Sequence, residues 1–121
     1  MKLKVSDHYH ASVVAIGGKF LGSVDGPAFR EAISDLKEKG QTRIVIDLSG
    51  TDMIDSTGIG QLISALTTMR NAGGDVRIAA LNKKIKNLFL MTRLLGPVFE
   101  NYEELDDALQ SFQDRPEPAS S

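Results

Sequence analysis

The side chains best placed to do chemistry form one run, Asp55-Ser56-Thr57-Gly58-Ile59-Gly60. A carboxylate and two hydroxyl groups stand there directly before a segment whose apolar residues have helical spacing. The first amide groups of a helix lack intrahelical acceptors, so either Ser56 or Asp55 can cap this helix. A hydroxyl at a helix start can equally be held open to a partner protein. The run therefore indicates a helix cap, a partner-binding surface, or both.

Two glycines, Gly58 and Gly60, occupy positions where a helix favours larger residues. Each costs about 0.5–1 kcal/mol relative to alanine, so something must offset the penalty. One explanation is a close approach of this helix to the sheet. The other is that a partner surface needs access to the Ser56 hydroxyl, and the sequence leaves both open.

The run does not match common enzymatic motifs. An aspartic protease needs an uninterrupted Asp-Ser-Gly or Asp-Thr-Gly, and Thr57 separates Ser56 from Gly58. A serine hydrolase needs a histidine near its nucleophile, but the two histidines, His8 and His10, belong to an amino-terminal turn. The chain has no cysteine, which excludes thiolate zinc sites and cysteine nucleophiles. We therefore expect no enzyme activity, no catalytic residues, no metal and no cofactor.

Strands and helices alternate along the chain around this run. Ile44-Val45-Ile46 are consecutive apolar residues, which predicts a central strand over 43–48 covered on both faces. Strands are also predicted at 2–7, at 13–16 and at 76–80, with an edge strand after a turn within 94–99. Helices are predicted from Phe29 to Gly40, from 59 to Gly73, around 85–89 and over 105–112, and 49–52 is predicted to be a polar loop.

This order predicts an α/β fold, or α+β by a stricter count, with about five strands and about four helices. An antiparallel hairpin begins the sheet, and right-handed parallel crossovers complete it. Met69 and Met91 fit core-facing helix positions. One domain over residues 1–113 accounts for the pattern. Residues 114–121 have nothing to bury and are expected to form a disordered tail.

Composition narrows the classes of partner. Of the 121 residues, 41% are hydrophobic and 25% charged, as in a globular domain. The net charge of −2 and the lack of a long Lys/Arg run argue against direct nucleic-acid binding. No apolar stretch approaches the roughly 18 residues of a membrane span, so no membrane association is expected. The lack of cysteine is compatible with the cytoplasm, where we expect the protein to work.

The stretch Ile44 to Gly60 resembles the signature of STAS domains. The likeness lies in Val45-Ile46-Asp47-Leu48 followed by Ile54 and the run Asp55-Ser56-Thr57-Gly58-Ile59-Gly60. It is most similar to the bacterial anti-sigma factor antagonists, also called anti-anti-sigma factors. The resemblance covers nearly the whole chain except the tail, and it implies a STAS-like mixed sheet.

The resemblance also implies a function, partner switching. In that family the corresponding serine, here Ser56, is phosphorylated by an anti-sigma factor that is also a serine protein kinase, and a serine phosphatase reverses the modification. The unphosphorylated form binds the anti-sigma factor and frees the sigma factor for transcription, whereas the phosphorylated form is released. The partner-binding residues expected on this basis are Asp55, Ser56, Thr57 and Gly58, flanked by Ser23 and Asp25.

Two further interpretations remain from the sequence. The same fold could serve as a non-switching STAS scaffold subunit of a lipid ABC transporter or of a sensory complex. Lys83, Lys84 and Lys86 open a predicted helix where cations oppose the helix dipole. They could mark a docking patch for an acidic partner, but three lysines on a turn are more often only solvated surface.

Overall fold

Ten helices and strands make up the part of the chain that the computed structural model describes, residues 1–96 and 98–113. In chain order they are β1 (Lys2–Asp7), β2 (Ser12–Phe20), α1 (Gly22–Glu38), β3 (Arg43–Asp47), β4 (Thr51–Ile54), α2 (Ser56–Asn71), β5 (Asp75–Ala79), α3 (Lys83–Met91), β6 (Asn101–Tyr102) and α4 (Leu105–Gln113). The tail expected at 114–121 lies outside the described residues.

The strands form one six-stranded mixed sheet in the order β1-β2-β3-β5-β6, with β4 paired to β2 off this path. β1 and β2 are antiparallel, and the other pairs are parallel. This arrangement confirms the predicted α/β class, the opening hairpin and the central position of β3. Within the described ranges, no helix has the length and apolarity to cross a bilayer.

β2 is longer than predicted, because it continues through Gly17 and Gly18 to Phe20. Gly18 has a positive φ of 80°, and the register shifts between Gly18 and Lys19. The first half of β2 pairs with β3 and its last residues pair with β4. The loop predicted at 49–52 is therefore wrong in its second half, where Thr51 begins β4.

α1 also begins earlier than predicted, at Gly22 instead of Phe29. Glycine and proline at the helix start favoured a turn, but Pro27 lies in the second turn of the helix without breaking it. Asp25 stabilises the start, because its Oδ2 accepts the amide of Leu21 at 2.9 Å. The extension places the amino terminus of α1 next to that of α2.

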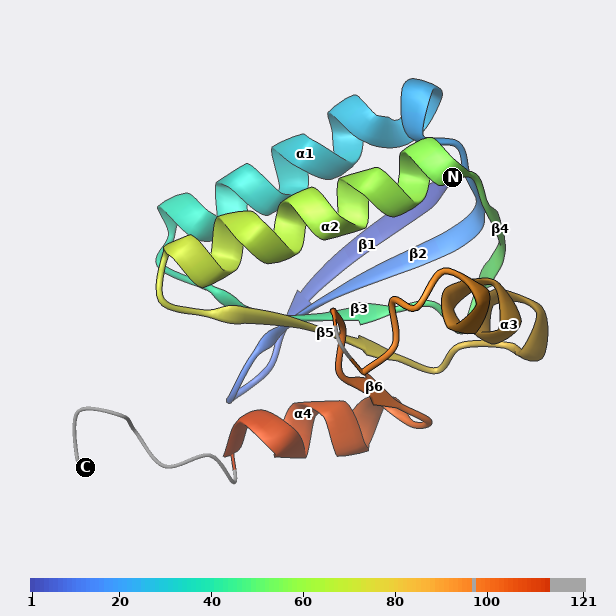
Figure 1. Cartoon of the computed structure of the whole chain (residues 1–121). Helices are drawn as coiled ribbons and strands as arrows, with labels where there is room; N and C mark the ends of the chain where they lie inside the picture. The colour runs from blue at the N-terminus through green and yellow to red at the C-terminus, as the bar shows by residue number, and fades with distance from the viewer. Residues whose placement is uncertain (97, 114–121) are drawn as a thin grey trace.

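Helices cover both faces of the sheet. α1 and α2 lie side by side on one face, and α4 lies on the other (Figure 1). Along β3, Ile44 and Ile46 belong to the core cluster under α1 and α2, whereas Val45 belongs to the cluster under α4. This two-sided burial is why three consecutive apolar residues identified the strand.

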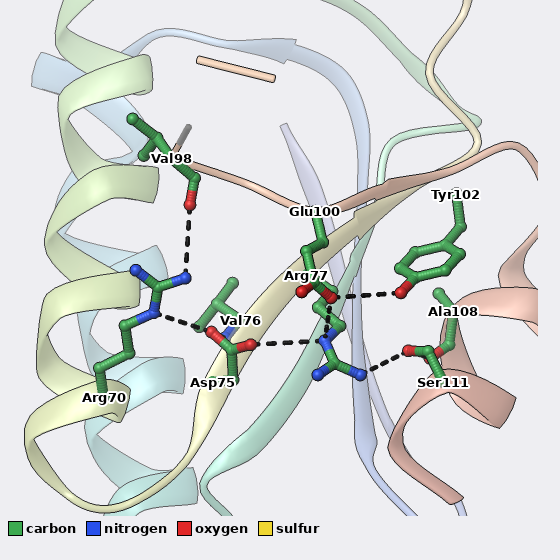
Figure 2. Close-up of polar contacts among 9 residues, drawn as sticks. All are labelled: Arg70, Asp75, Val76, Arg77, Val98, Glu100, Tyr102, Ala108 and Ser111. Carbon is green, nitrogen blue, oxygen red and sulfur yellow. Dashed lines mark hydrogen bonds and ion pairs between the residues drawn. The ribbon is translucent and has the colours of Figure 1, made fainter. Parts of the chain in front are cut away.

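A buried arginine attaches α4 to the sheet (Figure 2). The side chain of Arg77 is fully buried, and its Nε lies 2.9 Å from Oε2 of Glu100 and 3.4 Å from Oδ2 of Asp75. Its Nη1 donates to Oγ of Ser111 at 2.6 Å, and the guanidinium stands 3.9 Å from the ring centroid of Phe112. The arginine therefore joins β5, the segment before β6, and α4.

Candidate functional site

Ser56 is the first residue of α2, and one residue, Asp55, separates it from the short strand β4. Its side chain is exposed. Among the described residues, no hydrogen-bond partner is found for its hydroxyl. The hydroxyl is therefore free to meet another molecule, and the local fold does not depend on it.

Asp55, not Ser56, caps α2. Oδ1 of Asp55 accepts the amide of Gly58 at 2.7 Å, which is the usual bond of a helix cap. The same oxygen accepts the amide of Gly22, at the start of α1, at 3.0 Å. These two bonds, the one from Gly22 foremost, hold the pKa of the Asp55 carboxyl below its ordinary value of 3.8. Asp55 thus joins the amino termini of the two helices.

The glycines at this junction are explained by packing within the chain. A Cβ on Gly22 would stand 2.3 Å from the carbonyl carbon of Thr57 and 2.4 Å from the amide nitrogen of Gly58. A Cβ on Gly58 would stand 2.8 Å from the carbonyl oxygen of Phe20. Gly58 is buried, so its contacts are internal, and the close-approach explanation holds for this residue. Gly60 is exposed, and a Cβ on it would meet nothing within 4 Å.

The other expected partner-binding residues lie around the same junction. Thr57 and Ser23 are exposed, and Ser23 directly follows Gly22. Asp25 is half-buried, and its Oδ1 lies 3.8 Å from the amino-terminal ammonium of Met1. These residues, Asp55, Ser56, Thr57, Ser23 and Asp25, thus lie at the starts of α1 and α2, with Gly58 buried among them. The two helix starts lie together at one end of the molecule (Figure 1).

In the part of the chain that the structure describes, no histidine lies at this junction. His8 belongs to the turn between β1 and β2, at the opposite end of β2 from Phe20 and Asp55. Oγ of Ser6 lies 3.1 Å from Nε2 of that histidine. Among the described residues, no cluster of three metal-ligating side chains occurs. The site offers an accessible hydroxyl and a fixed backbone, which suits docking and modification.

Sequence reasoning missed the exposed apolar side chains that flank this end. Val24 is 73% exposed, and Met53 in β4 is 37% exposed. Met69 is buried as predicted, but Met91 is 82% exposed, so its predicted core position is wrong. The reason is that α3 buries only Ile85 and Phe89. The signal available in the sequence was the pair Leu90-Met91, which cannot both face the core that Ile85 and Phe89 reach.

Known proteins resemble the chain over nearly its whole length. The family model described as the STAS domain matches residues 3–108. A Thermotoga neapolitana protein, provisionally named as an anti-sigma factor antagonist, is 24% identical over 85% of this chain and 91% of its own length.

Two solved structures show the same fold. An anti-sigma factor antagonist from Mycobacterium paratuberculosis has a TM-score of 0.81 and 28% identity, covering 93% of this chain and 94% of that one. The Bacillus cell fate determinant SpoIIAA, solved in its phosphorylated form, has a TM-score of 0.69 and 15% identity, covering 91% and 98%. The family match spans most of the 121 residues and includes the junction around Ser56. The chain therefore belongs to the STAS domain family, whose members are non-enzymatic.

Proposed function

We propose that this protein is an anti-sigma factor antagonist switched by phosphorylation of Ser56. In its unphosphorylated state it binds an anti-sigma factor that is also a serine kinase, and so frees a sigma factor for transcription. Phosphorylation of Ser56 releases it, and a serine phosphatase restores it. The observation that carries the proposal is the exposed Ser56 hydroxyl, which forms no hydrogen bond with the described residues, at the start of α2.

The geometry supports a switch that leaves the fold intact. The cap of α2 uses Oδ1 of Asp55, so a phosphoryl group on Ser56 breaks no hydrogen bond of the junction. A helix amino terminus tolerates negative charge, because its free amides and dipole favour anions. We expect phosphorylation to change the surface while the scaffold keeps its structure.

The same phosphoryl group would disfavour the complex. It adds about 1.5 to 2 negative charges at pH 7. These charges would stand beside the carboxylate of Asp55, with the exposed Asp52 on the adjacent strand. An interface that fits a neutral hydroxyl must then desolvate the phosphate and bear the repulsion. Binding is therefore expected to weaken.

The names of two relatives, and the phosphorylated form of a third, support this assignment. Two similar proteins are named as anti-sigma factor antagonists, one of them provisionally. A protein of the same fold, SpoIIAA, has a phosphorylated form. We infer from them a protein partner in the cytoplasm, where a kinase has access to ATP.

The test is phosphorylation in vitro with site mapping. Each anti-sigma factor kinase of the source organism is purified and incubated with the chain and ATP, and the labelled peptide is identified by mass spectrometry. We expect one kinase to label Ser56 and to leave Ser56→Ala unlabelled. Thr57→Ala is the matched control, since it removes the adjacent exposed hydroxyl. If no kinase labels the chain, or if Ser56→Ala is still labelled, the proposal fails and the transporter or sensory scaffold gains support.

A further inference from the structure

A hollow of about 300 Å³ lies between β4 and α3. Its lining includes Met53 and Ile54 from β4, and Lys84, Ile85, Leu88 and Met91 from α3. We call it the α3 hollow. α3 packs against β4 near the end of the molecule where α2 begins (Figure 1).

The α3 hollow has an apolar floor and apolar walls that no described residue covers. Ile54 and Ile85 are buried beneath it. Met91 is 82% exposed and Met53 is 37% exposed, and both line the hollow. Exposed apolar side chains that cluster in this way mark interaction sites, and methionine adapts to differently shaped partners.

Lysines cluster at the start of α3, and one of them, Lys84, lines the α3 hollow. Between Asp75 and Glu100 the sequence has no Asp or Glu, but it holds Lys83, Lys84 and Lys86. These lysines oppose the dipole at the start of α3, which is already capped by the side chain of Asn82. None of the three forms an ion pair with a described residue. Helix stability does not account for them, and they favour an acidic partner.

The α3 hollow lies next to the Ser56 junction along the chain. Met53 and Ile54 line the hollow, and Asp55 and Ser56 follow them directly in the chain. A protein whose active site reaches Ser56 therefore has the hollow within reach of the same interface. A recess with a buried floor suits one inserted side chain better than a flat lipid surface.

We propose that the α3 hollow is a second docking point for the anti-sigma factor kinase. It takes one large apolar side chain from an acidic segment of that partner, and Lys84 in its lining, with Lys83 next to it at the start of α3, attracts the segment's carboxylates. This inference rests on the proposed function, because it assumes a kinase that acts on Ser56. The inference adds to that function a place where the kinase binds the chain, and it states that apolar and ionic contacts hold the two together.

The test is the steady-state kinetics of Ser56 phosphorylation. Met91→Ser removes the most exposed apolar side chain of the lining, and the double variant Lys83→Glu/Lys84→Glu reverses the charge at the start of α3, where Lys84 lines the hollow. Tyr9→Ser is the apolar control, since Tyr9 is 95% exposed in the distant β1–β2 turn. Lys37→Glu/Lys39→Glu is the charge control, at the far end of α1. We expect the hollow variants to raise KM by roughly tenfold or more while kcat stays near the wild-type value. The controls should leave both unchanged.

Each outcome decides between the two claims. If no kinase labels Ser56 of the wild-type chain, the proposed function and this inference fall together. If Ser56 is labelled and KM is the same in every variant, only the inference is overturned. Sedimentation with phosphatidylglycerol vesicles tests whether the α3 hollow meets a lipid surface instead of a protein. Binding to vesicles that Lys83→Glu/Lys84→Glu abolishes, with KM unchanged, would show that the face meets lipid instead.

Discussion

Oδ1 of Asp55 accepts the backbone amide of Gly22 at 3.0 Å and so ties the start of α1 to the start of α2. The two residues are 33 positions apart in sequence, and their contact brings the amino termini of α1 and α2 together. The same oxygen caps α2 through Gly58. One carboxylate thus fixes the backbone that presents the hydroxyl, and the hydroxyl itself stays unused by the fold.

Asp55→Asn should make the protein less stable near neutral pH. The amide preserves the shape of the side chain but removes the charge that both backbone donors favour. The pKa of Asp55 is lowered in the folded state, so its contribution is present above 3.8 and is lost as the pH falls through the folded value. Urea unfolding from pH 7 to pH 2 should show the gap between the two proteins closing below pH 3.8. A gap that stays constant over this range would contradict the role of the carboxylate.

Gly22→Ala should destabilise the junction. The new Cβ would stand 2.3 Å from the carbonyl carbon of Thr57, so α1 and α2 must separate. We expect a loss of about 1–3 kcal/mol in the free energy of unfolding, as for other overpacked sites. Gly60→Ala is the control, because a Cβ there meets nothing within 4 Å and the residue is in a helix. That variant should gain about 0.5–1 kcal/mol in the free energy of unfolding, and a loss at Gly60 would contradict the open space around that residue.

Arg77→Ala should weaken the attachment of α4. Its removal leaves the carboxylates of Asp75 and Glu100 without their shared cation. We expect a cost of about 3 kcal/mol, the lower end for a broken buried ion pair, because Glu100 is 43% exposed and can be hydrated. Arg70→Ala is the control, since Arg70 pairs with the same Asp75 from a side chain that is 50% exposed. Urea denaturation should show a loss of at most about 1 kcal/mol for that variant, and equal losses would contradict the special role of burial.

Hydropathy patterns predicted the elements that bury one face, such as α2, or both faces, such as β3. Ile44-Val45-Ile46 identified β3, and the spacing from Ile59 to Met69 identified α2. β4 was missed because it has only four residues, and Asp52 and Met53 in its middle are exposed. The start of α1 was missed because Gly22 indicates a turn locally, whereas its lack of a side chain is what lets α2 approach.

Other features of the fold depend on contacts between distant residues. Arg77 alternates with Val76 and Ile78 as though it faced solvent, yet Phe112 and Ser111 of α4 cover it. At the candidate site, the sequence left Asp55 and Ser56 as equal candidates for the cap. The structure separates them, because Oδ1 of Asp55 accepts the amide of Gly58 in α2 and also the amide of Gly22 in α1. Because Asp55 makes both bonds, the exposed hydroxyl of Ser56 is not used by the cap.

The most direct test of the account is the affinity of the anti-sigma factor for two forms of this chain, unmodified and stoichiometrically phosphorylated on Ser56. Calorimetric titration should show tight binding of the unmodified form and a loss of about two hundredfold, ~3 kcal/mol, on phosphorylation. Amide NMR spectra should show that shifts stay confined to the start of α2 and its neighbours. Equal affinity of the two forms, or loss of the fold on phosphorylation, would contradict a switch that acts through surface charge at Ser56.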